Sequence, residues 1–273
     1  MIRPPDMRDP EYIRAALPAL SFLVERYHET RITGLDELPR GPALVVGNHN
    51  GGIMSPDMFA LMVAYWRRWG ADAPAYGLMH DLPSMIPFVG SAMARFGAVP
   101  ARPATALDLL RRGAKVLVYP GGDLDAFKPH SRRHEIVFGR RRGFIRVALR
   151  AGVPVVPVVS VGAHEAFHVL TDGTNLARLL GTKRLTRVEV LPVTLGLPWG
   201  LWVGAMGYLP LPVRMRLHVL GPIAWPDLGP EAADDDEVVW RCREQVRVAM
   251  QAAMDSLVAE GGFGRKSLRE LLG

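Results

Sequence analysis

Short apolar runs rich in β-branched residues alternate with amphipathic segments along most of the chain. Four of these runs have the length of buried strands, and each ends in glycine, proline or polar residues, at 43–46, 97–102, 115–119 and 153–159. Shorter strands are expected at 30–33 and 75–78, and helices at 58–69, 84–96, 105–112 and 142–152. Alternation of strands and helices is typical of a sheet covered on both faces. We therefore expect an α/β fold with a mixed, mostly parallel sheet flanked by helices.

Two further helices are expected outside this core. The first, at about 9–28, has apolar residues at helical spacing but contains Pro18, which favours a kink or a break. The second, at about 231–260, is polar and begins with acidic residues, which suits a helix N-terminus. Since no linker or internal repeat divides the chain, we expect one domain over residues 1–273, with its core at about 30–225.

No charged residue occurs between positions 190 and 213. This segment is long enough to cross a bilayer, but its prolines and glycines disfavour a straight helix. Trp199, Trp202 and Tyr208 are residue types that prefer the membrane interface. We therefore rank an interfacial or re-entrant segment first, a buried part of the core second and a transmembrane span third. The alternating residues 214–220 that follow predict an edge strand.

Composition narrows the class of partner and the class of site. The hydrophobic fraction is 49%, and 33 Lys and Arg against 27 Asp and Glu give a formal net charge of +6. This balance favours anionic partners, namely phosphate esters, anionic lipid or nucleic acid. The single cysteine, Cys242, excludes an internal disulfide and a cysteine-based metal cluster. The first twelve residues are polar and lack the apolar core of a signal peptide.

The strand at 43–46 leads into the loop with the most evident candidate chemistry. The run delivers Asn48 and His49 to the strand's carboxyl end, and Ser55-Pro56-Asp57 then forms a strong helix start. Ligands of open α/β sheets bind outside the carboxyl ends of the strands. His49 with the Asp57 carboxylate is thus a candidate general-base dyad. The alternative is a loop histidine satisfied by backbone and an aspartate that only caps the helix.

Four strand ends, taken in order, resemble the four sequence blocks of the glycerolipid (PlsC-type) acyltransferases. Asn48-His49 with Asp57 is similar to the first block, and Gly97 with Arg102 to the second. Residues 119–123, read as Tyr-Pro-Gly-Gly-Asp, resemble the third, and the Val-Pro-rich run 153–157 the fourth. Two departures stand out: seven residues instead of four separate His49 from Asp57, and Pro-Gly-Gly in the third block is closer to the monoacylglycerol and diacylglycerol acyltransferase branch.

The resemblance implies O-acyl transfer from acyl-CoA or acyl-ACP to a hydroxyl of a glycerolipid, such as a lysophospholipid or a mono- or diacylglycerol. His49 would be the general base, oriented by Asp57, without a covalent intermediate. Backbone amides near Gly51-Gly52 or Gly121-Gly122 would stabilise the oxyanion, and Arg102 would bind a phosphate. Further substrate-binding candidates are Asn48, Gly97, Pro120, Gly121, Gly122 and Asp123. The resemblance implies no cofactor or metal, and a peripheral or monotopic location on the cytoplasmic membrane face.

Two other features suggest competing functions. Eight basic residues crowd a stretch whose only acidic residue is Glu135: Lys128, Arg132, Arg133, Arg140, Arg141, Arg142, Arg146 and Arg150. They indicate a surface for anionic headgroups or the phosphates of coenzyme A, and no nucleic-acid module signature is present. Residues 164–168 read His-Glu-Ala-Phe-His, which matches the zinc metalloprotease motif in letters but lacks an evident helix around it. A non-enzymatic peripheral membrane-binding protein is the third alternative.

Overall fold

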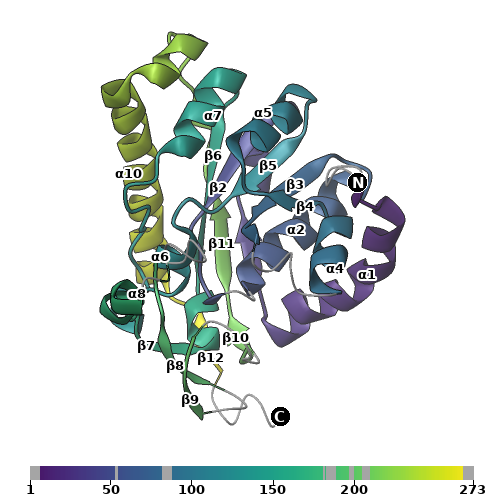
Figure 1. Cartoon of the computed structure of the whole chain (residues 1–273). Helices are drawn as coiled ribbons and strands as arrows, with labels where there is room; N and C mark the ends of the chain where they lie inside the picture. The colour runs from purple at the N-terminus through teal and green to yellow at the C-terminus, as the bar shows by residue number, and fades with distance from the viewer. Residues whose placement is uncertain are drawn as a thin grey trace.

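The centre of the protein is a seven-stranded sheet with the order β1-β11-β6-β2-β5-β3-β4 (Figure 1). The computed structural model describes residues 7–52, 55–81, 88–180, 182, 189–196, 200–204 and 210–266. The strands of the sheet are β1 Arg31–Thr33, β2 Ala43–Gly47, β3 Ala75–Met79, β4 Ala98–Pro100, β5 Lys115–Val118, β6 Val155–Val161 and β11 Arg216–Val219. Adjacent strands of this sheet are parallel except for the antiparallel pair β11–β6. The expected mixed, mostly parallel sheet is confirmed.

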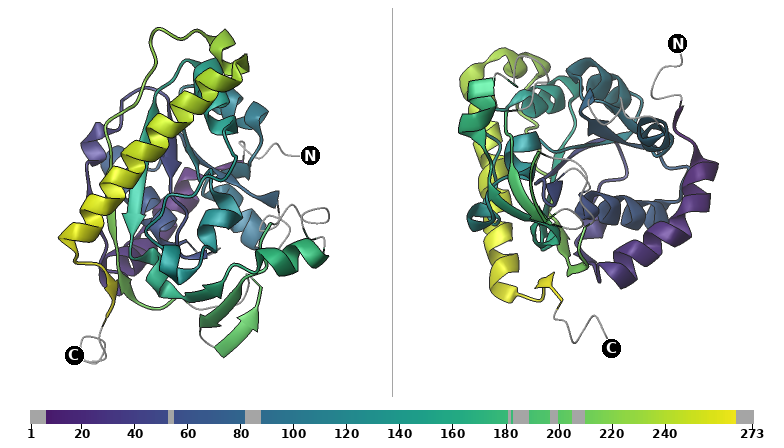
Figure 2. Two further views of the ribbon diagram at one scale, coloured as in Figure 1. Left: turned by 90° about the vertical axis from the view of Figure 1, so that its left-hand side faces the viewer. Right: turned by 60° about the horizontal axis from the view of Figure 1, so that its bottom comes forward.

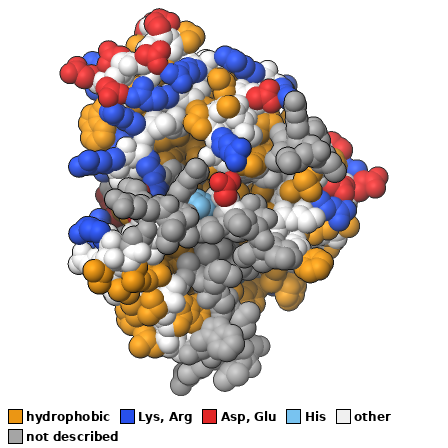
Figure 3. Space-filling view, in the orientation of Figure 1, with side chains coloured by type: hydrophobic (Ala, Val, Ile, Leu, Met, Phe, Trp, Pro, Cys, Tyr) orange, Lys and Arg blue, Asp and Glu red, His pale blue; other side chains and the backbone are white. Residues whose placement is uncertain are grey.

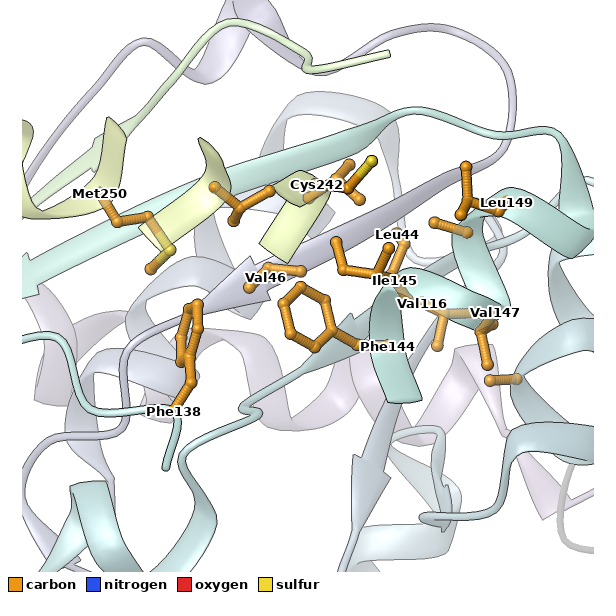
Figure 4. Close-up of a cluster of buried hydrophobic side chains, with 14 of the residues drawn as sticks. Leu44, Val46, Val116, Phe138, Phe144, Ile145, Val147, Leu149, Cys242 and Met250 are labelled. Carbon is orange, nitrogen blue, oxygen red and sulfur yellow. The ribbon is translucent and has the colours of Figure 1, made fainter. Parts of the chain in front are cut away.

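One face of the sheet is covered by α5 (Pro103–Arg111), α7 (Gly143–Ala151) and α10 (Asp236–Glu260). Leu44 and Val46 of β2 point to this side, where Phe144 and Ile145 of α7 and Met250 of α10 pack against them (Figure 4). Successive strand residues face opposite sides of a sheet, so both faces of the central strands are apolar. The result is the continuous β-branched run from which the strands were predicted.

The opposite face is covered by α1 (Pro10–Phe22), α2 (Pro56–Trp69) and α4 (Val89–Arg95), which Figure 1 shows grouped on one side of the sheet. Val45 of β2 belongs to this second core together with Ile13 of α1 and Trp66 of α2. Pro18 lies within α1, which does not break there but ends in a π-helical turn at Leu23–Tyr27. The N-terminal helix packs against α2 and α4 in this second core.

The long C-terminal helix α10 runs along one side of the molecule (Figure 2). The Asp235 carboxylate caps it by accepting hydrogen bonds from the backbone of Glu237 and Val238, and a short 3-10 helix, Pro230–Asp234, precedes it. Its polar sequence nevertheless contains one buried stripe at helical spacing: Val239, Cys242, Val246, Met250, Met254 and Leu257.

A smaller antiparallel sheet projects from one end of the molecule (Figures 1 and 2). It consists of β7 (His168–Thr171), β8 (Val193–Gly196) and β9 (Gly200–Val203), with α8 (Thr174–Leu180) beside it. The described part of 190–213 is thus largely a β-hairpin, whereas Trp199 and Tyr208 lie outside the described residues. Within the described ranges, no helix has the length and apolar character needed to span a membrane.

The segment 214–220 differs from the expected edge strand. It divides into β10 (Val213–Arg214), which pairs with β12 (Gly264–Arg265), and β11, which lies between β1 and β6. The short strand β1 is the edge instead. For the helix expected at 84–96, residues 82–87 lie outside the described part of the chain, and α4 accounts for most of the remainder.

Sheet order decides which strand-end loops can meet. β6, β2 and β5 are neighbours that run in the same direction, so the loops after them leave the sheet at one place. His49 follows β2, the Pro120–Asp123 turn follows β5, and Gly162 follows β6. Arg102 follows β4, three strands away from β2, which corresponds to roughly 14 Å across the sheet.

Candidate active site

His49 lies directly beyond the carboxyl end of β2, in the middle of the sheet. The residue is partly exposed, and its ring packs on the ring of Tyr119 with 4.9 Å between the centroids. Burial lowers the pKa of His49 to about 4, and the positive charge of Lys128 acts in the same direction. The imidazole is therefore neutral at physiological pH and holds a lone pair that can accept a proton.

The ring nitrogen Nδ1 of His49 contacts Ser55. Its distance to the Ser55 Oγ is 2.8 Å, and the serine side chain is buried. The loop between them folds back through Gly51, whose φ is +76° and at which a Cβ would lie 2.9 Å from the Ala163 carbonyl oxygen. The glycine thus allows the return of the chain that brings Ser55 to the ring.

Asp57 is buried at the start of α2 and engages Ser160 of β6. Its Oδ2 accepts a hydrogen bond of 2.5 Å from the Ser160 hydroxyl, and its Oδ1 one of 2.9 Å from the backbone N–H of Met58. Burial raises the pKa of Asp57 to about 7, and these hydrogen bonds oppose the shift. The contact between Asp57 and the His49 ring that the sequence predicted is replaced by the contact with Ser55.

Two asparagines attach the His49 loop to β6. The Asn48 side chain exchanges two hydrogen bonds with the backbone of Ser160, donating to its carbonyl at 3.1 Å and accepting from its N–H at 2.8 Å. Asn50 Nδ2 donates to the same carbonyl at 2.7 Å. Asn48 is 1% exposed and pairs in this way with β6, so its side chain supports the loop. The role in substrate binding expected from the sequence stays a prediction.

The third block forms a tight turn that is packed against the His49 loop. Arg141 donates to the Gly121 carbonyl and forms an ion pair with Asp123 at 2.6 Å. The turn leads into α6 (Gly122–Ala126), and the Gly122 N–H is bound to the Tyr119 carbonyl at 3.1 Å. That amide is therefore already used within the turn and does not serve as the free oxyanion donor considered from the sequence.

A buried ion pair lies beneath this turn. Lys128 Nζ and Asp125 Oδ1 are 2.7 Å apart, and both side chains are almost fully buried. The other Asp125 oxygen accepts a hydrogen bond of 2.6 Å from the backbone N–H of His49. Asp125 therefore connects the third block to the backbone of the first, while the Lys128 charge favours the neutral form of the His49 ring.

The second block lies apart from this centre. Gly97 has a φ of +96°, and a Cβ there would lie 2.9 Å from the Ala75 carbonyl oxygen, so its requirement for glycine is structural. Arg102 is exposed just before α5, and the structure places it at the far side of the sheet from His49. It can reach only a distant part of a substrate that also meets His49.

The basic stretch 128–150 is largely neutralised by ion pairs. In this fully described stretch, seven of its eight cations have a carboxylate partner, and the exception is Arg140. Arg142 and Arg146 both pair with Asp236 at the start of α10, and Figure 3 shows basic and acidic side chains intermixed there. The stretch is a mixed surface and not a continuous cationic patch.

The His-Glu-Ala-Phe-His motif is not on an α-helix. Residues Ala163–Ala166 form a 3-10 helix and His168 begins β7, so the two histidines do not share one helix face as the metalloprotease motif requires. His164 Nε2 is 2.8 Å from the Lys128 carbonyl oxygen. Among the described residues, no group of three or more His, Cys, Asp or Glu side chains is arranged to hold a metal ion.

Three residues of this centre did not stand out as site residues in the sequence: Ser55, Asp125 and Ser160. Ser55 was interpreted as a helix cap, although in the structure its hydroxyl faces the loop before the helix. Asp125 lies two positions after the third block, and that proximity was its only signal. Ser160 is one polar position in an apolar strand, and that interruption was its only signal.

Comparisons with known proteins indicate the family of this chain. The family model described as Acyltransferase matches residues 29–161. An uncharacterised protein of Mycobacterium tuberculosis is 31% identical over 262 residues, which cover 95% of this chain and 69% of that protein. The human "DGAT1/2-independent enzyme synthesizing storage lipids" is 26% identical, and the match covers 84% of this chain and 62% of that protein.

Among solved structures, the fold is similar to that of the 1-acyl-sn-glycerophosphate acyltransferase PlsC from Thermotoga maritima. The TM-score is 0.53 with 18% sequence identity, and the match covers 92% of this chain and 84% of that one. At this identity the similarity concerns the fold.

Proposed function

Because this chain belongs to the PlsC-type acyltransferase family, we propose that it transfers a fatty acyl group from acyl-CoA or acyl-ACP to a hydroxyl group of a glycerolipid. The observation that carries this proposal is the placement of a neutral, partly exposed histidine at the carboxyl end of the central strand. Loops from the first, third and fourth blocks surround it. Ligands of open α/β sheets bind at this position.

His49 is the proposed general base. It takes the proton of the acceptor hydroxyl as that oxygen attacks the thioester carbonyl carbon. The C–S bond then breaks, and the leaving thiolate takes the proton back from the imidazolium. The enzyme forms no covalent intermediate in this scheme, and no resident cofactor is needed. A ring with its pKa lowered to about 4 is neutral before the reaction, as the scheme requires.

The acceptor is proposed at the level of a glycerolipid. Arg102 supports a phosphate on a long substrate, since it follows β4, which lies about three strand spacings from β2, the strand that precedes His49. The pantetheine and nucleotide portion of acyl-CoA has such a length, as does the phosphopantetheine of acyl-ACP. The Pro-Gly-Gly turn resembles that of enzymes with neutral acceptors, so Arg102 fits the donor's phosphates as well as it fits an acceptor's.

We also propose peripheral contact with an anionic membrane on its cytoplasmic face. The support is the apolar surface of α8 and the β7–β8–β9 sheet, which is visible at the lower left of Figure 3. Its exposed side chains are Leu170, Leu176, Leu179, Leu180, Leu195, Leu201 and Val203. The three strands contain no Asp, Glu, Lys or Arg, a composition that suits an interface with lipid.

A screen with a labelled acyl thioester and purified protein tests the proposal. Lysophosphatidate, other lysophospholipids, monoacylglycerol and diacylglycerol are offered as acceptors in detergent or liposomes. We expect His49→Gln to lower kcat by roughly 10²–10⁴-fold, because it removes the base and keeps a polar side chain of similar size.

Arg40→Gln, a change in an exposed residue on the segment before β2, is the matched control and should leave the rate near that of the wild type. Full activity of His49→Gln would refute the role of the base. Absence of transfer by the wild type to every acceptor would refute the proposed substrates.

A further inference from the structure

The hydroxyl group of Ser55 is surrounded by three potential partners. Its Oγ is 2.8 Å from His49 Nδ1, 3.1 Å from the Asn50 carbonyl oxygen and 3.0 Å from the Gly52 carbonyl oxygen. The side chain is 1% exposed, so solvent does not compete for these contacts. All three partners belong to the His49–Ser55 loop.

The chemistry of these partners determines where the protons lie. A serine hydroxyl has one proton to donate and two lone pairs that accept. Carbonyl oxygens only accept, so the contacts with Asn50 and Gly52 require the Ser55 proton. The remaining contact, with His49, is then satisfied only if Nδ1 carries a proton and donates it to Ser55 Oγ. In a neutral imidazole the lone pair must in that case be on Nε2.

We infer that Ser55 is a positioning residue that holds His49 in the Nδ1–H tautomer and leaves Nε2 free to accept the proton of the acceptor hydroxyl. This inference rests on the proposed role of His49 as the base. It gives Ser55 the orienting function that the sequence resemblance implied for Asp57. The serine acts through the histidine and makes no contact with substrate in this scheme.

The charged groups around the ring agree with this assignment. Asp57 is engaged by Ser160 and Met58, and Asp125 accepts from the backbone N–H of His49, not from its ring. Lys128 and Asp123 act on the ring only through their charges, in opposite directions. Among the described side chains, Ser55 is the one in hydrogen-bond contact with the His49 ring. The Asn50 backbone also forms a hydrogen bond with the ring, which raises its pKa. Of these two partners Ser55 is the one that a side-chain substitution removes, so it is the one to which we assign control of the tautomer.

The tautomer can be measured directly in the wild-type protein. In protein labelled with ¹⁵N-histidine, long-range ¹H–¹⁵N correlation spectra at pH 7.5 distinguish the two neutral tautomers and the imidazolium. The His49 signals are those missing from the spectrum of His49→Gln. We expect the pattern of the Nδ1–H form. The Nε2–H form, an equal mixture or a protonated ring would overturn the inference.

Substitutions then connect the tautomer to Ser55. In Ser55→Ala we expect the His49 signals to shift to a mixture of tautomers, with a roughly tenfold lower kcat and an unchanged KM. Ser55→Thr retains the hydroxyl and should restore both the spectrum and most of the rate. The matched control is Ser160→Ala, which removes a second buried hydroxyl that contacts Asp57 and should leave the His49 tautomer unchanged.

The two proposals fail in different ways. An unchanged His49 spectrum in Ser55→Ala would refute the role of Ser55 even if the enzyme requires His49. Conversely, an active His49→Gln variant would refute the general base even if the wild-type ring is in the Nδ1–H form.

Discussion

Asp57 is the residue whose environment differs most from its predicted role. It is a carboxylic acid in a site with little solvent, and its two hydrogen bonds only partly replace the lost hydration. Its pKa of about 7 in the folded protein compares with an ordinary value near 3.8. The fold therefore favours the protonated acid. At this position the carboxyl group fixes the start of α2 to β6.

This environment predicts that ionisation of Asp57 lowers the free energy of unfolding at high pH, and that Asp57→Asn removes this loss. A carboxyl group whose pKa is raised by folding contributes its full stability below about pH 4 and loses it as the pH rises to about 7. Asparagine stays neutral and can still accept from Met58 and donate to Ser160. We expect the variant to have a higher free energy of unfolding than the wild type at pH 8, by up to about 4 kcal/mol, with a difference near zero at pH 4. Urea unfolding at the two pH values measures this.

Asp72→Asn is the control for the loss of one charge. Asp72 forms an exposed ion pair with Arg14, and such pairs contribute about 0–1 kcal/mol. The control variant should therefore follow the wild type at both pH values. A destabilised Asp57→Asn at pH 8 would show that the buried carboxylate is ionised without cost and is held by its hydrogen bonds.

At the scale of elements, the turn after β5 has little space for change. A Cβ on Gly121 would lie 2.3 Å from the Asp125 Cβ and 2.3 Å from the Val137 carbonyl oxygen. Neither neighbour is the flexible end of a side chain. Asp125 also holds the backbone of His49, so a displacement here is transmitted to the proposed base.

Gly121→Ala should therefore affect both stability and catalysis. We expect a loss of about 1–3 kcal/mol in the free energy of unfolding, from overpacking, together with a fall in kcat. Gly143→Ala at the start of α7 is the matched control, since no atom lies within 4 Å of its added Cβ. It should keep wild-type activity and stability within about 1 kcal/mol. Equal behaviour of the two variants, in thermal unfolding and acyl transfer, would contradict the packing argument.

The elements also show what the sequence pattern could and could not predict. β2, β5 and β6 were predicted correctly because strands buried on both faces have continuous apolar sequences. β11 was wrongly expected at an edge because its sequence alternates. That alternation arises within the sheet, where Leu217 and Val219 enter the core and Arg216 and His218 face a half-exposed side.

Contacts between distant loops were beyond prediction for a different reason. Asn48 and Ser160 are 112 positions apart, and their pairing depends on the register of β2 with β6. Local periodicity contains no information on that register. The resemblance to a family located His49, whereas the partner of its ring depends on how the Gly51 loop folds back.

At the scale of the whole molecule, the apolar surface of α8 and β7–β8–β9 lies on a projecting part of the protein, outside the two main cores (Figure 2). Leu179 and Leu201 are 82% and 63% exposed, so they contribute little to the stability of the fold. Full transfer of a leucine side chain from water is worth about 1.5–3 kcal/mol. A surface of several such residues would thus bind weakly but measurably to a bilayer.

Replacement of these leucines should weaken membrane binding without unfolding the protein. We expect Leu179→Ser with Leu201→Ser to lower the partition coefficient to anionic liposomes at least tenfold in a sedimentation assay, because both side chains lose the transfer energy gained at the interface. Phe22→Ser is the matched control, since Phe22 is 62% exposed but lies at the end of α1. A greater loss in the control than in the double variant would move the contact to the N-terminal helix. Unchanged binding of the double variant and of the control would show that binding depends on charge alone, and high salt should then abolish it.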